Sequence, residues 1–345
     1  MSLPRSLPAS TAYPLRGGPV LRWGVLAPGV IAGDWVETVH ANTDQRVVAV
    51  ASRTRSRAEA FAATHGIERV HEHYEALVGD PGVDVVYIAA PHTEHHRLAL
   101  LAISAGKHVL IEKPIAVTER EAAEIADAAR AAGVFAMEAM WSRFLPQTTV
   151  IATLLRDGVL GAPRLVTADF GGRFDFDPHG RAFNPALSGG SMLDLGVYSL
   201  WFTTFVLGEP AGVTARGSLA VTGVDEQATV LLDYGNALGV ASSSMVVDTA
   251  VTAVVNGQDA RLEVDGPFCA PGGFRLVAGD EQLRYDDPNA FTWRAGLCYQ
   301  ATAVAAHVAA GLTEAPEHPL CASLRVLRII DEARRQLGYR FAGEA

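Results

Sequence analysis

Three residues in two separate segments have the types and the setting to move protons. Lys113 stands in the stretch HVLIEKP, where an apolar run ends in a glutamate, a lysine and a proline. Asp194 and Tyr198 stand four residues apart in GGSMLDLGVY, so they share one face of any helix that contains them. An ammonium, a carboxylate and a phenol can together hold and transfer a proton when an alcohol is oxidised.

Lys113 faces a ligand if the apolar run before it is a strand of a parallel sheet. Ligands of such sheets bind outside the carboxyl ends of the strands. Pro114 pushes the residue before it toward an extended backbone, which directs Lys113 into that crevice. The alternative is a surface ion pair between Glu112 and Lys113 ahead of a helix, and this stretch alone does not decide between the two.

The helix predicted for Ser191–Leu207 is apolar nearly all the way round. A carboxylate in that setting must be paired, because an unpaired one is costly to bury. The glycine pair at 189–190 allows a ligand to approach the backbone closely, which favours a functional site. Two structural interpretations compete with it. Asp194 could belong to a cap begun by Ser191, and Tyr198 could be an ordinary core aromatic.

The elements around Lys113 predict a doubly wound parallel sheet. From Leu21 to Met140, apolar runs typical of buried strands alternate with helical patterns of roughly 10–15 residues. The predicted strands are Arg22–Leu26, Arg46–Ala51, Asp84–Ala90, His108–Ile111 and Val134–Ala139. The predicted helices are Ser56–His65, Glu94–Ala105 and Thr118–Ala132, each followed by a glycine that suits a helix end.

The sequence after residue 140 predicts a second, α+β domain. Short β-rich runs between Val213 and Tyr285 are divided by turn residues, which indicates an open, mostly antiparallel sheet. The other elements predicted there are a strand at Arg164–Phe174 and helices at Pro146–Arg156 and Leu320–Leu337. The expected domains are a loose N-terminal tail at 1–20, a Rossmann dinucleotide-binding domain at 21–140 and an α+β domain at 141–345.

The first predicted strand ends in a turn that suits a dinucleotide. Such a turn has the form G-x-G-x-x-G/A, whose small residues let the backbone approach a pyrophosphate. The stretch APGVIA begins with Ala27, places Gly29 at the middle glycine, and continues with Val30 and Ile31. Because Ala27 replaces the first glycine, we expect its φ angle to be negative and the local geometry to differ.

The residues after the second predicted strand favour NADP over NAD. NAD enzymes usually place Asp or Glu there for the ribose 2′-hydroxyl. The stretch ASRTRSR instead offers Ser52, Arg53 and Arg57, with no carboxylate before Glu59. A hydroxyl and guanidinium groups suit a 2′-phosphate. The alternative is that the arginines only begin a solvated helix, but arginine near a helix N-terminus is unfavourable against the helix dipole, which favours an anionic partner. NAD remains possible.

Two further segments carry polar groups close to predicted strand ends. PHTEHH contains His92, His95 and His96, but no fourth ligand lies nearby, so a metal is not expected. Trp141 and Arg143 follow the last predicted strand of the Rossmann domain. They could stack on and hydrogen-bond a polyol or the cofactor, or they could pack between domains.

Composition excludes several classes of partner. The 345 residues are 49% apolar, and 28 basic against 38 acidic residues give a net charge of −10. Such a chain lacks the basic surface that nucleic acids need, and anionic membranes repel it. No apolar run reaches the roughly 20 residues of a membrane span. Three well-separated cysteines indicate neither disulfides nor a zinc site, which suits the cytoplasm.

Taken in order, these segments resemble the Gfo/Idh/MocA family of glucose–fructose oxidoreductase, inositol dehydrogenase and rhizopine-catabolism proteins. The motifs that carry the resemblance are GVLAPGVIA, PHTEHH, EKP, MEAMWSRFLP, GGSMLDLGVY and GVDEQATVLLDY. It runs from about Leu21 to Tyr339. The most similar branch is the one that contains dimeric dihydrodiol dehydrogenases and NADP-dependent D-xylose dehydrogenases.

The resemblance implies an enzyme that transfers hydride between NAD(P) and the CH–OH of a sugar, polyol or trans-dihydrodiol. Lys113, Asp194 and Tyr198 would be its catalytic residues, with the acid/base role left open between Lys113 and Tyr198. The remaining implied positions are Ala90, Pro91, His92, His95 and Glu112 at the cofactor, and Trp141 and Arg143 with Asp194 and Tyr198 at the substrate.

The resemblance also implies a homodimer, or a dimer of dimers, formed through the open sheet of the C-terminal domain. Alternating apolar residues in QATVLLDY and ALGVASSSMVV are compatible with a covered sheet face. A non-catalytic sensor or regulatory protein that binds NAD(P) on the same fold is the alternative function.

Overall fold

The computed structural model describes residues 3–341, in which the chain forms two compact units. One unit comprises residues 12–144 together with residues 294–323. The other comprises the residues up to Thr11, residues 145–293 and the residues from Leu324 onward. The unit that contains the predicted Rossmann region therefore also takes in a segment from far along the chain.

The unit of residues 12–144 and 294–323 is built on a six-stranded sheet in which all strands are parallel. Its strands are β1 (Arg22–Leu26), β2 (Arg46–Ala51), β3 (Arg69–His71), β4 (Val85–Ile88), β5 (His108–Glu112) and β6 (Ala136–Ala139). Their order is β3-β2-β1-β4-β5-β6, so the direction of winding reverses between β1 and β4. This confirms the predicted doubly wound sheet.

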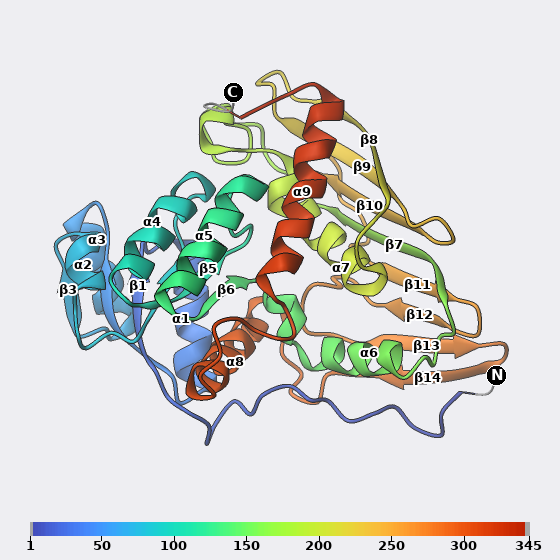
Figure 1. The fold of residues 1–345 in the computed structure, drawn as a ribbon, viewed down its shortest axis with the longest axis horizontal. Coiled ribbons are helices and arrows are strands. Elements are labelled where there is room, and N and C mark those ends of the chain that lie inside the picture. Colours follow the sequence, from blue (N-terminus) through green and yellow to red (C-terminus); the bar gives the residue numbers. More distant parts are fainter. Residues whose placement is uncertain (1–2, 342–345) are drawn as a thin grey trace. The chain divides into compact units, whose positions relative to one another are not determined.

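Helices cover this sheet, and two of them, α4 and α5, pack side by side (Figure 1). The helices are α1 (Val30–Asn42), α2 (Arg55–His65), α3 (Tyr74–Val78), α4 (His92–Ser104), α5 (Glu119–Ala132), the 3₁₀ turns η1 (Trp141–Phe144) and η4 (Trp293–Leu297), and α8 (Cys298–Ala309). At the start of α5 the Thr118 hydroxyl accepts the Glu121 N–H at 3.2 Å, as predicted for a capping pattern. The sequence analysis did not predict β3, α3 or α8.

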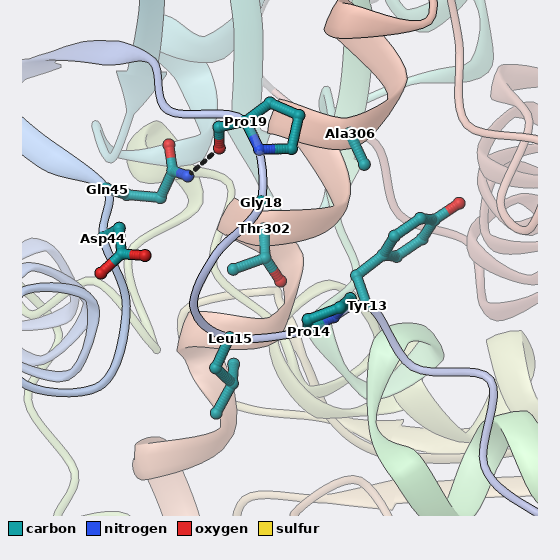
Figure 2. A pocket seen from close by; sticks show the side chains of 9 residues that line it. All are labelled: Tyr13, Pro14, Leu15, Gly18, Pro19, Asp44, Gln45, Thr302 and Ala306. Carbon is teal, nitrogen blue, oxygen red and sulfur yellow. Dashed lines mark hydrogen bonds between the residues drawn. The ribbon is translucent and has the colours of Figure 1, made fainter.

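The leader before β1 contains no helix or strand over residues 3–21, yet it is hydrogen-bonded along its length. Gly17 N–H donates to the Asp44 carboxylate at 2.7 Å, and the Gln45 amide donates to the Pro19 carbonyl at 2.7 Å. Figure 2 shows this part of the leader lying over α8 and enclosing a cavity of about 30 Å³, enough for roughly one water.

The second unit is built on an eight-stranded sheet that is antiparallel except for one parallel pair, β7 and β10. The strands are β7 (Pro163–Gly171), β8 (Gly212–Leu219), β9 (Asp225–Asp233), β10 (Leu238–Ser244), β11 (Ala253–Gly257), β12 (Arg261–Val264), β13 (Phe274–Ala278) and β14 (Glu281–Tyr285). In β9, buried and exposed residues alternate, so one face of the sheet is covered and the other is open. The predicted open, mostly antiparallel sheet is confirmed.

Helix α7 covers the buried face of this sheet by packing against β7, β10 and β11. The helices of the unit are α6 (Pro146–Arg156), the 3₁₀ turn η2 (Pro185–Leu187), the π-helix η3 (Met192–Gly196) and α7 (Val197–Leu207). Helix α9 (Leu320–Leu337) begins in the first unit and belongs to this one from Leu324 onward. The single helix predicted for Ser191–Leu207 therefore begins with a π-helical turn. Such turns are rare and are often found at functional sites.

The stretch Pro185–Leu207 is long and apolar enough to span a membrane by length and composition alone. This differs from the expectation that no run would reach that length. In the structure 83% of its apolar window is buried inside the protein, so packing against the sheet accounts for its composition.

Candidate active site

The parallel register brings the predicted cofactor residues to one edge of the six-stranded sheet. Leu26 pairs with both Ala51 and Ile88, and Ile88 pairs with Ile111. The residues that follow these strand ends therefore share the carboxyl edge. They are Ala27, Ser52, Ala90 and Lys113. This edge, at the point where the winding reverses, is where open α/β sheets bind their ligands.

The first turn of this edge leaves its backbone accessible. Ala27 has φ 59°, so the negative angle expected for it is wrong. Ala27 N–H donates to the Ala51 carbonyl at 3.0 Å, and this bond helps to hold the left-handed conformation, which costs a non-glycine residue about 1–2 kcal/mol. A Cβ at Gly29 would meet nothing within 4 Å, and Val30 is 78% exposed.

The accessible turn fits a dinucleotide. Gly29 is the N-cap of α1, whose unpaired N–H groups and dipole suit a pyrophosphate. Val30 and Ile31 follow in the first turn of the helix. When bound, a dinucleotide would lie against Gly29, Val30 and Ile31, and it would cover the exposed apolar surface of Val30.

Of the three arginines after β2, one forms ion pairs with carboxylates and two do not. Arg55 forms ion pairs with Glu59 at 2.8 Å and with Glu72 at 2.7 Å. Within residues 3–341, Arg53 and Arg57 are exposed and have no acidic partner. Ser52 is 8% exposed, and its hydroxyl accepts the Thr54 N–H at 3.3 Å, which closes the turn. Arg53 and Arg57 thus remain available to an anion.

Lys113 is half-buried while its neighbours from Val109 to Val117 are buried. Next to it, Glu112 is 6% exposed and accepts the Tyr87 hydroxyl at 2.5 Å and the Lys113 N–H at 3.3 Å. Burial raises the pKa of Glu112, and the hydrogen bond from Tyr87 opposes that rise. The Lys113–Pro114 peptide is cis.

Two further buried side chains hold the loop after Lys113. The ring nitrogens of His95 lie 2.8 Å from the Pro114 and Ala90 carbonyl oxygens, so His95 connects two parts of the cofactor edge. Burial lowers the pKa of His95, and the two carbonyls oppose it. The Glu138 carboxylate accepts the Ile115 N–H at 3.0 Å.

Glu138 is in turn held by residues near the start of α9. Its second oxygen is 3.0 Å from His318 Nε2 and accepts the Ser323 hydroxyl at 2.6 Å. Burial raises the pKa of Glu138, but the hydrogen bonds from His318, Ser323 and Ile115 outweigh burial and hold the pKa below its ordinary value. Glu138 thus stays ionised and fixes the loop that follows Lys113.

The histidines of PHTEHH have separate roles. The His92 and His95 rings pack edge to face with centroids 5.7 Å apart, and His96 Nε2 lies 2.8 Å from a Glu124 oxygen. Among residues 3–341, no three His, Cys, Asp or Glu side chains are placed to hold a metal ion.

Trp141 and Arg143 lie in η1, directly after β6, and are 4% and 9% exposed. Arg143 Nε donates to the Glu317 carbonyl at 2.8 Å. Burial lowers the pKa of Arg143 to about 10, still well above neutral, so the guanidinium keeps its charge.

Asp194 and Tyr198 lie in the second unit and are each 7% exposed. The Asp194 carboxylate is paired, as its apolar setting requires, by two hydrogen bonds from Arg181 at 3.0 and 2.9 Å. The Asp194 carboxylate raises the pKa of Arg181. The Tyr198 ring packs against Phe170 with centroids 5.6 Å apart. The cap interpretation is wrong, because the Ser191 side chain caps no backbone N–H of this helix.

The structure brings the predicted cofactor residues and Lys113 together within one unit, and Asp194 and Tyr198 together within the other. Sequence reasoning did not assign Arg181, Tyr87 or Glu138. A signal existed for Arg181, since a carboxylate in an apolar helix needs a cation, but nothing in the sequence selects this arginine among many.

Comparisons with known proteins match both parts of the chain. Residues 21–140 match the model of an oxidoreductase family with an NAD-binding Rossmann fold, and residues 149–265 match the GFO/IDH/MocA C-terminal domain. The chain is 36% identical over 331 residues to trans-1,2-dihydrobenzene-1,2-diol dehydrogenase of Macaca fascicularis, covering 93% of this chain and 98% of the relative. The human protein of that name is 35% identical with the same coverage.

Solved structures show the same fold. Aldose–aldose oxidoreductase from Caulobacter crescentus, complexed with glycerol, has a TM-score of 0.82 at 26% identity and covers 92% of this chain and 97% of that one. A levoglucosan dehydrogenase in complex with NADH and levoglucosan has a TM-score of 0.84 at 16% identity with the same coverage, which shows the fold alone.

The fold and the cofactor edge thus define an oxidoreductase with an NAD-binding Rossmann domain. More narrowly, the chain belongs to the GFO/IDH/MocA family, because both family models match it and relatives above 30% identity span nearly its whole length.

Replacing Glu138 by glutamine tests the anchor of the Lys113 loop. We expect E138Q to lower the free energy of unfolding by about 3 kcal/mol at pH 7, because it removes the buried carboxylate on which the hydrogen bonds of Ile115, His318 and Ser323 meet. The pKa of Glu138 is lower in the folded state, so the wild-type advantage is full above the unfolded pKa near 4.5 and declines as the pH falls below it. Urea unfolding of both proteins between pH 7 and pH 3 measures this difference in the free energy of unfolding.

The control is E124Q, which removes an exposed carboxylate that pairs with Arg120 and His96 on the helix surface. Exposed pairs contribute about 0–1 kcal/mol, so E124Q should unfold almost as the wild type does. An E138Q penalty no larger than that of E124Q, or one that grows on acidification, would contradict the anchor role.

Proposed function

We propose that this protein is a cytoplasmic, NADP-dependent dehydrogenase or reductase of a sugar, polyol or trans-dihydrodiol. Hydride passes between the nicotinamide and a CH–OH carbon, and Tyr198 and Lys113 handle the proton. The observation that carries the proposal is the cofactor edge, at which Lys113 is the one incompletely buried residue between Val109 and Val117. The dihydrodiol dehydrogenases, which are 36% identical over nearly the whole chain, support this class of substrate.

The chemistry follows from the groups that this chain supplies. Bound NADP supplies the hydride acceptor when the alcohol is oxidised. As the carbinol C–O bond becomes a carbonyl, the hydroxyl proton must leave, and we assign its acceptance to Tyr198 in its phenolate form, which becomes the neutral phenol. The Lys113 ammonium stabilises the negative charge on the Tyr198 phenolate oxygen, and on the carbinol oxygen as its proton leaves. Asp194, held by Arg181, orients a second hydroxyl of the substrate.

The cofactor preference is proposed from the charges after β2. Arg53 and Arg57 offer guanidinium groups that no carboxylate among residues 3–341 neutralises, and Ser52 adds a hydroxyl at the strand end. These groups suit the 2′-phosphate of NADP. A 3-ketoreductase from Actinomadura kijaniata, solved in complex with NADP, shares the fold with a TM-score of 0.74 at 27% identity.

A homodimer, or a dimer of dimers, formed through the open face of the eight-stranded sheet is part of the proposal. Leu165, Leu231 and Leu238 are 37%, 40% and 44% exposed, and Leu165 pairs with Leu238 across β7 and β10. Exposed leucines next to one another on a sheet face favour a protein partner.

Light scattering should give a mass of at least two chains, and a mass of one chain at micromolar concentration would overturn the dimer.

Removal of the two proposed proton-handling groups tests the function. We expect Lys113→Ala and Tyr198→Phe each to lower kcat at least about 100-fold, because a positioned acid or base contributes 10²–10⁴-fold. Initial rates are followed by nicotinamide absorbance with a panel of aldoses, cyclic polyols and trans-dihydrodiols. Circular dichroism and NADPH fluorescence titration establish that the variants fold and bind the cofactor.

Two results would contradict this assignment. Near-normal kcat in either variant would remove its proposed role. A wild-type protein that binds NADPH but turns over no member of the panel would favour a cofactor-binding sensor instead of an enzyme.

Cofactor choice is tested by comparing two arginines of the same loop. We expect Arg53→Ala to raise the KM for NADP about tenfold or more and the KM for NAD less than twofold, because only NADP carries the 2′-phosphate. Arg55→Ala is the matched control, since Arg55 is already paired with Glu59 and Glu72. Two results would argue against the phosphate contact. One is an R53A variant in which the KM for NADP and the KM for NAD rise equally, and the other is an R55A variant in which the KM for NADP rises as much as in R53A.

A further inference from the structure

A buried carboxylate holds the start of the segment that carries Asp194. Asp225, the first residue of β9, is 1% exposed. One of its oxygens accepts the Ser191 hydroxyl at 2.6 Å and the Met192 N–H at 2.8 Å. The other accepts the Tyr339 hydroxyl at 2.5 Å. Three donors from two distant parts of the chain therefore meet on one carboxylate.

Packing around this carboxylate fixes both ends of the π-helix η3. Gly190 has φ 131°, and a Cβ there would lie 2.2 Å from Asp225 Oδ1. At the other end, a Cβ on Gly196 would lie 3.0 Å from Ser243 Oγ, which is itself 2.8 Å from Ser191 Oγ. Both ends of η3 thus pack against one polar cluster, with no room for larger side chains.

Asp194 lies between these two fixed ends. Its carboxylate takes both hydrogen bonds from Arg181, a residue of the separate loop before η2. Tyr198 follows η3 directly, in the first turn of α7. A shift at the start of η3 therefore moves the Asp194 carboxylate. It also moves the first turn of α7, and with it the backbone of Tyr198.

We propose that Asp225 is a positioning residue for the proposed dehydrogenase. Its hydrogen bonds to Ser191 and Met192 fix η3 so that Asp194 and Tyr198 present their side chains to one substrate. Through Tyr339, the same carboxylate ties this segment to the end of α9. The inference rests on the proposed function only for its catalytic consequence, since the fixing of η3 is a property of the fold.

The test compares Asp225→Ala, Asp225→Asn and the control Asp169→Ala. Asn keeps one oxygen for Ser191 and Met192 and offers its amide to the Tyr339 oxygen, so it should restore what Ala loses. Asp169 also accepts two backbone N–H groups, at 3.0 and 3.2 Å, but these belong to residues 251–252. Hydrogen exchange of backbone amides, kcat for the substrate found with the wild type, and the Kd for NADPH are measured.

We expect D225A to speed amide exchange in residues 191–198 at least tenfold and to lower kcat at least tenfold, with the Kd for NADPH within twofold. D225N should stay within about threefold of the wild type in both readouts. D169A should speed exchange at residues 251–252 and leave residues 191–198 and kcat unchanged. If D225A does not fold, Tyr339→Phe and Ser191→Ala remove one donor each and should show the same pattern at smaller size.

Wild-type exchange and kcat in D225A would overturn the proposal, and so would a D225N variant no better than D225A. The proposal would also be overturned if D169A sped amide exchange in residues 191–198 as much as D225A does. Asp225 would then contribute only to the general stability of the fold. If the wild type turns over no substrate, the proposed function fails, and the exchange rates of residues 191–198 still decide whether Asp225 fixes η3.

Discussion

The parallel register of the six-stranded sheet is the constraint on which the rest depends. Because parallel strands run in one direction, the residues that follow them meet at one edge. That geometry collects Ala27, Ser52, Ala90 and Lys113, which are far apart in the sequence, beside the point where the winding reverses. The turn after β1, the arginines after β2 and the lysine owe their proximity to it.

Buried carboxylates then fix the side chains that this fold brings close. Glu112, Glu138, Asp194 and Asp225 are each at most 7% exposed, and each accepts hydrogen bonds from groups on other elements. A buried carboxylate without such donors would cost several kcal/mol, so each one demands a defined arrangement around it.

Much of the fold could be predicted because local signals are strong there. Strands β1 and β2 and helices α6 and α9 have the predicted bounds, since apolar runs and the spacing of apolar residues mark them. The missed β3 spans only three residues, too few for a pattern. The π-turn before α7 is hydrogen-bonded to Asp225 through the Met192 N–H, and the Ala27 N–H donates to the Ala51 carbonyl. Such tertiary contacts leave no signal in the local sequence.

Lys113, Asp194 and Tyr198 could be named as candidates from their types, whereas their partners Tyr87, Glu138 and Arg181 could not.

The central proposal is that the Lys113 ammonium and the Tyr198 phenol serve one substrate carbinol group. A crystal structure with NADP and a bound substrate or unreactive analogue tests it most directly. We expect Lys113 Nζ and Tyr198 OH each to lie about 3 Å from the same substrate hydroxyl. Two side chains on opposite surfaces, or separated by more than the width of a sugar ring, would contradict the account.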